Sequence, residues 1–255
     1  MTASGWLVAL LAAVAGALLS MLVFAALGLK RDSDAQAKGT HFLMGTGDFL
    51  VHWFLWALKP VDAVAARLKL TPDSFNLAGL GFGALSGLAI AIGSLEWGGV
   101  AILLAGVADV MDGRVARTQG VSNDYGKFID STLDRFVEVF AFLGFVYFLR
   151  SFPWGPLLGA AALAGSLLVS YARARGESLG VLCKEGLMQR AERLVLTTLV
   201  CLADAPICEA LGQPKGAAVL VTLAVIAVLT LWTAAQRTLW ISARLRERDR
   251  LKSSA

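Results

Sequence analysis

The sequence predicts an all-α polytopic membrane protein, and three observations lead to this fold class. Of the 255 residues, 57% are hydrophobic and 16% are charged, whereas soluble proteins average about 45–50% and about 25%. The mean hydropathy of +0.67 departs in the same direction. Apolar stretches of about 20 residues, the length that crosses a bilayer, recur along the chain. A soluble enzyme, a disulfide-stapled secreted module and a disordered chain are therefore excluded.

The first apolar stretch, residues 5–29, carries no charge and is long enough to span a membrane. We predict that residues 1–38 form a transmembrane anchor and a short cytoplasmic linker. Residues 39–71 mix aromatic, basic and acidic side chains, a pattern typical of an amphipathic helix in the membrane interface. A soluble linker helix is the alternative for this segment.

Six further apolar segments predict six core helices within residues 72–243: 75–95, 97–115, 125–149, 154–174, 186–202 and 216–241. Turn-forming residues at 72–74, 151–153 and 204–214 separate several of them. Asp73 or Ser74 is expected to cap the first of these helices. The last residues, 244–255, are expected to form a basic cytoplasmic tail.

The basic residues also predict how the chain is oriented. With the amino terminus outside, only Arg150 and Lys215 fall in outer loops, and the positive-inside rule then places the carboxyl terminus in the cytoplasm. We expect an inner-membrane protein whose active site faces the cytoplasm. The net charge of +4, from Lys+Arg 23 against Asp+Glu 19, is mild for a nucleic-acid binder. No nucleic-acid partner is expected.

Acidic residues occur where a membrane helix normally avoids them. Asp109 and Asp112 lie at the end of one apolar segment, and Asp130, Asp134 and Glu138 lie in the first half of the next. A carboxylate near the middle of the bilayer costs about 2.5–3.5 kcal/mol. Spacings of three and four place the acids of each segment on one helix face. Oxygen ligands gathered in this way suit Mg²⁺ or Mn²⁺.

The alternative is that these acids form loop salt bridges with the basic residues between them. Gly113, Ala116 and Gly126 lie in the same stretch and favour a binding site, because small residues let a ligand approach the backbone closely.

The stretch from Asp109 to Asp134 reads D-x₂-D-G-x₂-A-R-x₈-G-x₃-D-x₃-D. It resembles the signature of the CDP-alcohol phosphatidyltransferase family at each fixed position, and the resemblance extends over roughly residues 69–243. It implies a six-helix membrane enzyme core, usually a homodimer, to which this chain adds one N-terminal transmembrane helix and an interfacial amphipathic helix. Such enzymes transfer a phosphatidyl group from CDP-diacylglycerol to an alcohol and release CMP.

The resemblance also implies roles for individual residues. Asp109, Asp112, Asp130 and Asp134 would hold two metal ions, Mg²⁺ or Mn²⁺. Asp134 would in addition be the catalytic general base on the acceptor hydroxyl. The nucleotide site would consist of Gly113, Ala116, Arg117 and Gly126, with Arg117 supporting the acids or the phosphates.

Two basic clusters bear on the acceptor: Ser170, Arg173 and Arg175 in one helix end, and Arg190 and Arg193 at the start of the next helix. Guanidinium groups bind phosphate oxygens in bidentate fashion, so these residues favour an anionic acceptor. Contacts with lipid head groups are the simpler alternative. Together with the acidic motif, the clusters are similar to those of bacterial phosphatidylinositol phosphate synthases, which implies inositol 1-phosphate as the acceptor.

Three other functions stay open at this point. Phosphatidylglycerophosphate synthase, or another CDP-alcohol phosphatidyltransferase, would use the same chemistry on a different acceptor. An ion-coupled transporter would use intramembrane acids as an ion path, but these acids gather at one face of the membrane. An inactive membrane scaffold would not need all four aspartates.

Overall fold

The computed structural model of the chain describes residues 3–27, 47–183 and 185–253, and in this part it contains helices and no strand. Part of the predicted linker and the start of the predicted amphipathic segment lie outside the described residues. The helices are α1 (Ala3–Ala26), α3 (Asp48–Ala57), α4 (Lys59–Arg67), α5 (Pro72–Ala91), α6 (Leu95–Thr118), α7 (Asp124–Phe148), the 3₁₀ turn η2 (Leu149–Ser151), α8 (Gly155–Ser178), α9 (Arg190–Ala210) and α10 (Ala217–Ser253).

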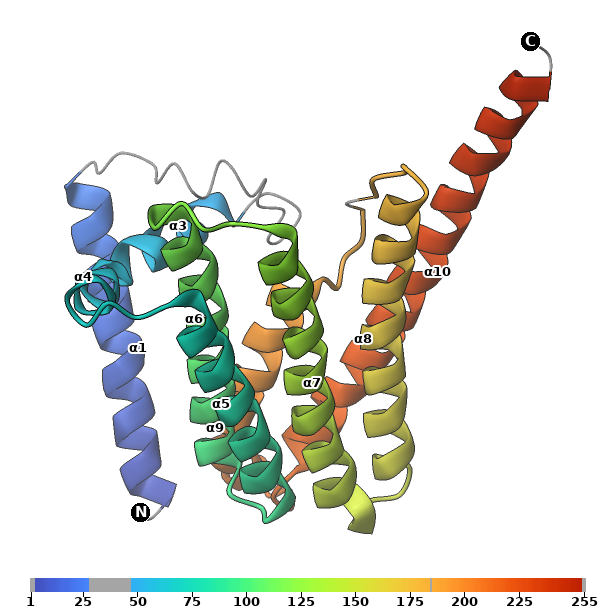
Figure 1. Cartoon of the computed structure of the whole chain (residues 1–255). Helices are drawn as coiled ribbons and strands as arrows, with labels where there is room; N and C mark the ends of the chain where they lie inside the picture. The colour runs from blue at the N-terminus through green and yellow to red at the C-terminus, as the bar shows by residue number, and fades with distance from the viewer. Residues whose placement is uncertain (1–2, 28–46, 184, 254–255) are drawn as a thin grey trace.

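Helices α5 to α10 correspond to the six predicted core helices and run side by side as a bundle (Figure 1). α5 packs on α6 and α7, α9 packs on α6, and α10 packs on α8 and α9. Small residues allow the helices to approach closely. A Cβ atom at Gly83 of α5 would lie 2.8 Å from Val137 Cγ2 of α7, and one at Gly106 of α6 would lie 2.7 Å from Leu194 Cδ1 of α9. The predicted all-α class is confirmed.

The apolar core lies toward the end of the bundle where α5 ends and α6 begins. Ile90, Leu95, Phe145, Leu149 and Leu223 are fully or almost fully buried there and form one cluster. The opposite end, where α6 ends and α7 and α9 begin, holds the charged residues of the signature (Figure 1). The bundle is therefore held together by apolar packing at one end and carries polar groups at the other.

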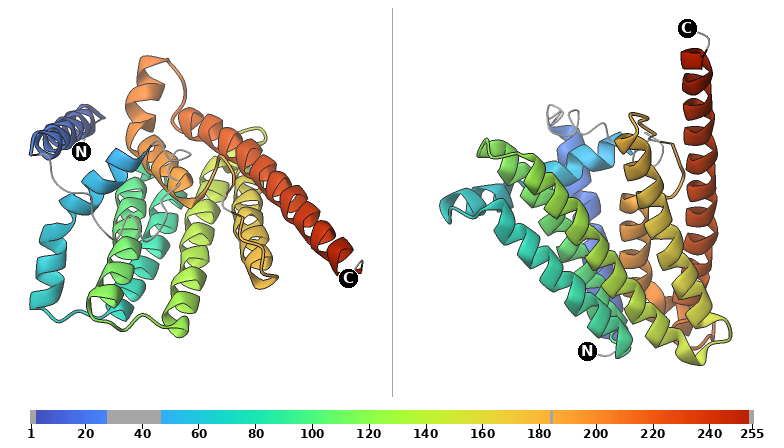
Figure 2. Two further views of the ribbon diagram at one scale, coloured as in Figure 1. Left: turned by 90° about the horizontal axis from the view of Figure 1, so that it is seen from above. Right: turned by 45° about the vertical axis from the view of Figure 1, so that its right-hand side comes forward.

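By length and composition, five helical stretches of the described residues can cross a membrane: Gly5–Ala26, Asp48–Arg67, Pro72–Ala91, Gly155–Ser178 and Ala217–Ser253. Helices α6, α7 and α9 run along the same bundle (Figure 1). They are not among these five stretches, and each carries several charged residues within its length. The stretch Asp48–Arg67 is interrupted at Leu58. Its two halves, α3 and α4, lie across the polar end of the bundle (Figure 2). The placement of this segment in the membrane interface stays a prediction.

The helix boundaries differ from the prediction at three places. Thr71, not Asp73 or Ser74, caps α5: its Oγ1 accepts the Ser74 N–H at 3.3 Å. The reason is that Pro72, which has no N–H to satisfy, takes the first helical position. The predicted turn at 204–214 is wrong in extent, because α9 continues through Pro206 to Ala210.

The third difference is at the carboxyl end, where the predicted tail continues α10 as a helix to Ser253. Arg248 fastens this part of α10 to the end of α8 by donating to the Leu179 carbonyl at 2.8 Å. Beyond the bundle the helix projects freely (Figure 1).

Candidate active site

The acids of the signature converge where the end of α6 meets the start of α7. One carboxylate oxygen from each of Asp109, Asp112 and Asp130 lies within 4.8 Å of the others. Asn123 fixes the start of α7, since its Oδ1 accepts the Gly126 N–H at 2.8 Å. Three carboxylates this close together repel one another and fit a hard divalent cation that accepts oxygen ligands. The chemistry of this donor set therefore suits the predicted metal site.

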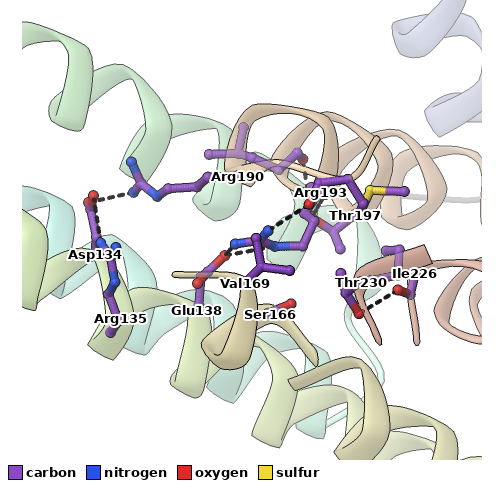
Figure 3. A network of polar contacts seen from close by, with 12 residues as sticks. Asp134, Arg135, Glu138, Ser166, Val169, Arg190, Arg193, Thr197, Ile226 and Thr230 are labelled. Carbon is purple, nitrogen blue, oxygen red and sulfur yellow. Dashed lines mark hydrogen bonds and ion pairs between the residues drawn. The ribbon is translucent and has the colours of Figure 1, made fainter. Parts of the chain in front are cut away.

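Asp134 lies at the edge of this cluster and is bridged to it by an arginine. Arg190 donates from Nη1 to Asp109 Oδ2 at 2.7 Å and from Nη2 to Asp134 Oδ1 at 2.5 Å. Arg135 adds a longer ion pair of 3.6 Å to the other oxygen of Asp134 (Figure 3). Gly106 lies about one helical turn from Asp109 in α6, and Leu194 lies about one turn from Arg190 in α9. The close approach of Gly106 and Leu194 brings α9 near enough to α6 for this bridge.

A second ion pair lies one helical turn further along α7. Glu138 Oε1 accepts from Arg193 Nε at 3.0 Å and from Nη2 at 2.5 Å (Figure 3). Arg193 is 2% exposed and also donates to the Met188 carbonyl at 3.2 Å. The structure therefore places Arg193 inside the bundle, where it joins α9 to α7.

The other predicted acceptor residues lie on the end of α8. Arg173 is exposed and pairs with Glu177 at 2.8 Å, and Arg175 is exposed and contacts Ser178 at 3.5 Å. Ser170 is half-buried. Of the predicted basic residues, Arg190 is thus the one that the described contacts bring onto the signature acids.

The predicted nucleotide residues adjoin the acids. Gly113, Ala116, Arg117 and Gly126 are all half-buried, at the end of α6 and the start of α7. A Cβ atom at Gly126 would meet one neighbour, Asn123 Oδ1, at 3.4 Å, so the space beside this glycine is open to a ligand.

Two of the neighbouring basic residues pair with acids outside the signature, which disfavours the loop salt bridges considered above for these two. Lys127 pairs with Asp124 at 2.9 Å, and Arg114 pairs with Asp62 of α4. Arg135 is the exception, through its long contact with Asp134.

Two residues of this end were missed by sequence reasoning. Asn76 lines a narrow cleft of ≈ 10 Å³ beside Asp109, Asp134 and Arg190, space for about one water molecule. Arg237 of α10 is 2% exposed and donates to the carbonyls of Glu185 at 2.7 Å and Val169 at 3.0 Å.

Arg237 therefore fixes the segment that leads into Arg190. Thr233 helps, because its Oγ1 accepts the Met188 N–H at 3.3 Å. An arginine inside an apolar helix was the signal in the sequence that could have identified this role.

The sequence profile of the CDP-alcohol phosphatidyltransferase family matches residues 70–245. The chain belongs to this family. The phosphatidyltransferase is 35% identical over 205 residues to the phosphatidylinositol phosphate synthase of Streptomyces avermitilis, which covers 77% of this chain and 82% of that protein. It is 38% identical over 136 residues to the archaetidylinositol phosphate synthase of Methanothermobacter thermautotrophicus, which covers 53% of this chain and 68% of that protein.

Solved structures agree with this membership. The phosphatidylinositol phosphate synthase of Mycobacterium tuberculosis with CDP-DAG bound superimposes with a TM-score of 0.61 at 26% identity, over 71% of this chain and 92% of that one. The same enzyme in complex with manganese and citrate gives a TM-score of 0.62 at 25% identity, over 71% and 87% of the two chains. The phosphatidyltransferase is thus an integral membrane enzyme of a metal-dependent family, and its Asp cluster supports binding of a divalent metal.

Proposed function

We propose that this phosphatidyltransferase is a phosphatidylinositol phosphate synthase. It would transfer the phosphatidyl group of CDP-diacylglycerol to a hydroxyl of inositol 1-phosphate and release CMP. The observation that carries the proposal is the position of Arg190, whose guanidinium lies directly on the acid cluster. A permanent cation at this place suits an acceptor that carries its own phosphate better than a neutral one. The names of the relatives from Streptomyces and Mycobacterium support the same acceptor.

Asp109, Asp112, Asp130 and Asp134 would hold two divalent ions, Mg²⁺ or Mn²⁺, as the family resemblance implies. Bound there, the metal would neutralise the pyrophosphate and stabilise the leaving CMP. The cluster of three carboxylates within 4.8 Å supports this assignment, with Asp134 one helical turn from Asp130.

In the proposed reaction, the acceptor hydroxyl oxygen forms a bond to the phosphatidyl phosphorus while the bond from phosphorus to CMP breaks. Asp134 would take the hydroxyl proton, because it is the signature acid at the edge of the cluster, next to Arg190. Gly113, Ala116, Arg117 and Gly126 would bind the nucleotide beside the acids.

The acceptor phosphate would bind among Arg190, Arg173, Arg175 and Ser170, with α8 and α9 supplying the two sides of the pocket. Arg193, which the sequence predicts for the same pocket, is instead buried and paired with Glu138, so it would position α9 and Arg190 rather than bind the phosphate itself. The enzyme would work as a homodimer in the inner membrane. Its polar end would face the cytoplasm, as the distribution of basic residues predicts.

CMP release by the purified enzyme tests this function. CDP-diacylglycerol and Mg²⁺ are supplied with inositol 1-phosphate, glycerol 3-phosphate, free inositol or serine, each in a separate reaction. We expect release with inositol 1-phosphate. Release with glycerol 3-phosphate instead would indicate phosphatidylglycerophosphate synthase, and no release with any acceptor from a folded protein would reject the proposal.

A pair of matched variants tests the proposed base. Asp134→Asn should abolish CMP release without unfolding the protein. Asp124→Asn removes an exposed acid from the first turn of the same helix and should leave the release unchanged. Full activity of Asp134→Asn would contradict the role of this carboxylate.

A further inference from the structure

The N-terminal helices α1, α3 and α4 precede residues 70–245, the region that matches the family profile, and none of the roles proposed above involves them. We call these three helices the N-terminal arm. A direct contact joins the arm to the helix that carries Asp109 and Asp112. Arg114 of α6 donates from Nε to Asp62 Oδ1 at 3.1 Å and from Nη2 to Asp62 Oδ2 at 2.5 Å. This two-bond fork fixes both the distance and the orientation of the two groups.

The fork lies on the side of α6 that faces away from the metal-site acids. Arg114 follows Asp112 by two residues, and two residues turn an α-helix by about 200°. The arm therefore contacts α6 through Arg114 on one side of the helix, while Asp112 faces the acids of α7 from the opposite side. Only 10% of the Arg114 side chain is exposed, compared with 31% for Asp62, so the pair is largely shielded from water.

Apolar packing reinforces the fork on the same face of α6. Met111 and Val115 are buried against Leu58 and Ala65 of the arm, and Met111 is fully buried. Met111 immediately precedes Asp112 in the chain. Asp112 therefore lies between Met111, which packs against the arm, and Arg114, which is ion-paired to Asp62 of α4.

Within the arm, α3 is fastened to α1. The ring of Phe24 lies 5.6 Å from the rings of both Phe49 and Trp56, and Trp53 Nε1 donates to Ser20 Oγ at 2.9 Å. Most of the remaining apolar side chains of α1 are exposed, as expected for a helix surrounded by lipid. A continuous set of contacts thus leads from a membrane anchor through α3 and α4 to α6.

Repulsion among Asp109, Asp112 and Asp130 tends to push α6 and α7 apart. We propose that the N-terminal arm opposes this repulsion, and that Asp62 and Arg114 are positioning residues that keep Asp112 in place for the divalent metal. This inference rests on the metal site proposed above. It assigns the arm to the assembly of the active site rather than to anchoring alone.

The test is Mn²⁺ binding to the purified full-length protein, measured as loss of the electron paramagnetic resonance signal of free Mn²⁺ without donor or acceptor. Simple electrostatics predicts opposite effects for the two partners. Asp62→Asn removes a negative charge and should weaken binding, and Arg114→Gln removes a positive charge and should strengthen it. Positioning predicts that both variants weaken Mn²⁺ binding, by about 10-fold, as for other residues that orient metal ligands.

Three further variants make the result decisive. The double variant Asp62→Asn with Arg114→Gln should lose no more affinity than either single variant, because both remove the same contact. Arg114→Lys keeps the charge but not the fork and should also weaken binding, which covers the case that Arg114→Gln misfolds. Asp124→Asn, from an exposed pair on α7, should leave the affinity unchanged.

Tighter Mn²⁺ binding by Arg114→Gln, or unchanged binding by both Asp62→Asn and Arg114→Lys, would overturn the inference. Failure of the proposed function would give a different experimental result. A wild-type protein that binds Mn²⁺ but does not use inositol 1-phosphate would reject the acceptor and leave the role of the arm intact. A wild-type protein that does not bind Mn²⁺ would overturn the inference, because it would remove the metal site on which it rests.

Discussion

The buried ion pair between Glu138 and Arg193 gives a prediction whose size follows from its burial. Arg193 is 2% exposed and 11% of the Glu138 side chain is exposed. Glu138→Ala would leave a buried guanidinium without its carboxylate, a change that costs about 3–5 kcal/mol of unfolding free energy. Glu138→Gln keeps an oxygen acceptor but not its charge, so we expect a smaller loss of about 1–2 kcal/mol.

The pair between Arg173 and Glu177 is the matched control, because it joins the same residue types with 45% and 39% of the side chains exposed. Glu177→Ala should cost about 0.2–1 kcal/mol, since water screens this pair. The free energy of unfolding can be measured in mixed micelles by titration with a denaturing detergent. A loss for Glu138→Ala no larger than that for Glu177→Ala would refute the reasoning.

A double substitution separates charge from packing at the same place. Replacing both partners, Glu138→Leu with Arg193→Met, removes the charges together and leaves no unpaired ion. Replacement of buried ion pairs by apolar residues of similar size is often neutral or stabilising. The double variant should therefore be more stable than Glu138→Ala. If it is less stable, the hydrogen bonds of the pair matter more than the desolvation of its charges.

Three further predictions concern the elements around the site. Gly106→Ala would place a methyl group 2.7 Å from Leu194 Cδ1. We expect the unfolding free energy to fall by about 1–3 kcal/mol. CMP release should also become slower, because a shift of α9 would move Arg190. Arg237→Met would remove the contact that holds the segment before α9 at the Glu185 carbonyl, together with the contact to the Val169 carbonyl of α8. Protease cleavage at this segment should become faster and CMP release slower, and unchanged cleavage would contradict the anchoring role. Asp204→Asn weakens a buried cap in which Asp204 accepts two backbone N–H groups at the start of α10. The unfolding free energy should fall by about 1–2 kcal/mol. CMP release by the folded enzyme should not change, because this cap lies at the end of the bundle opposite the acids.

The sequence was sufficient for the helices and for the acids because both follow from spacing along one chain. The pattern from Asp109 to Asp134 specifies which carboxylates share a helix face, and packing of consecutive helices then brings the two faces together. The apolar segments likewise predicted α5 to α10, since a helix that crosses lipid needs a minimum apolar length.

Partners across the fold could not be derived in this way. Whether Arg190 and Arg193 contact an acid depends on how closely α9 approaches α6 and α7. That distance depends on contacts such as the one between Gly106, which has no side chain, and Leu194. The sequence presented these arginines as equivalent to Arg173. The structure pairs Arg190 with Asp134 and Arg193 with Glu138, both acids of α7, and leaves Arg173 exposed.

Boundaries also escaped the prediction where a distant residue decides them. The turn expected at 204–214 is shorter because α9 extends past Pro206 to Ala210, and Asp204 lies inside this helix, where its buried side chain caps α10. The cap of α5 was misplaced by a few residues for a local reason, the preference of proline for the first helical position.

The gathering of all the signature acids at one end of the bundle has a consequence for the lipid that such an enzyme makes. In the proposed reaction, the donor, the water-soluble acceptor and the released nucleotide would all meet the protein at this end, so the new lipid would remain in the leaflet where its donor lay. A headgroup that carries phosphate charges does not cross hydrocarbon unaided, because burying a charge is very costly. Synthesis by the proposed reaction would therefore add mass to one leaflet only, and the membrane would grow evenly only if another protein moved lipid to the opposite leaflet.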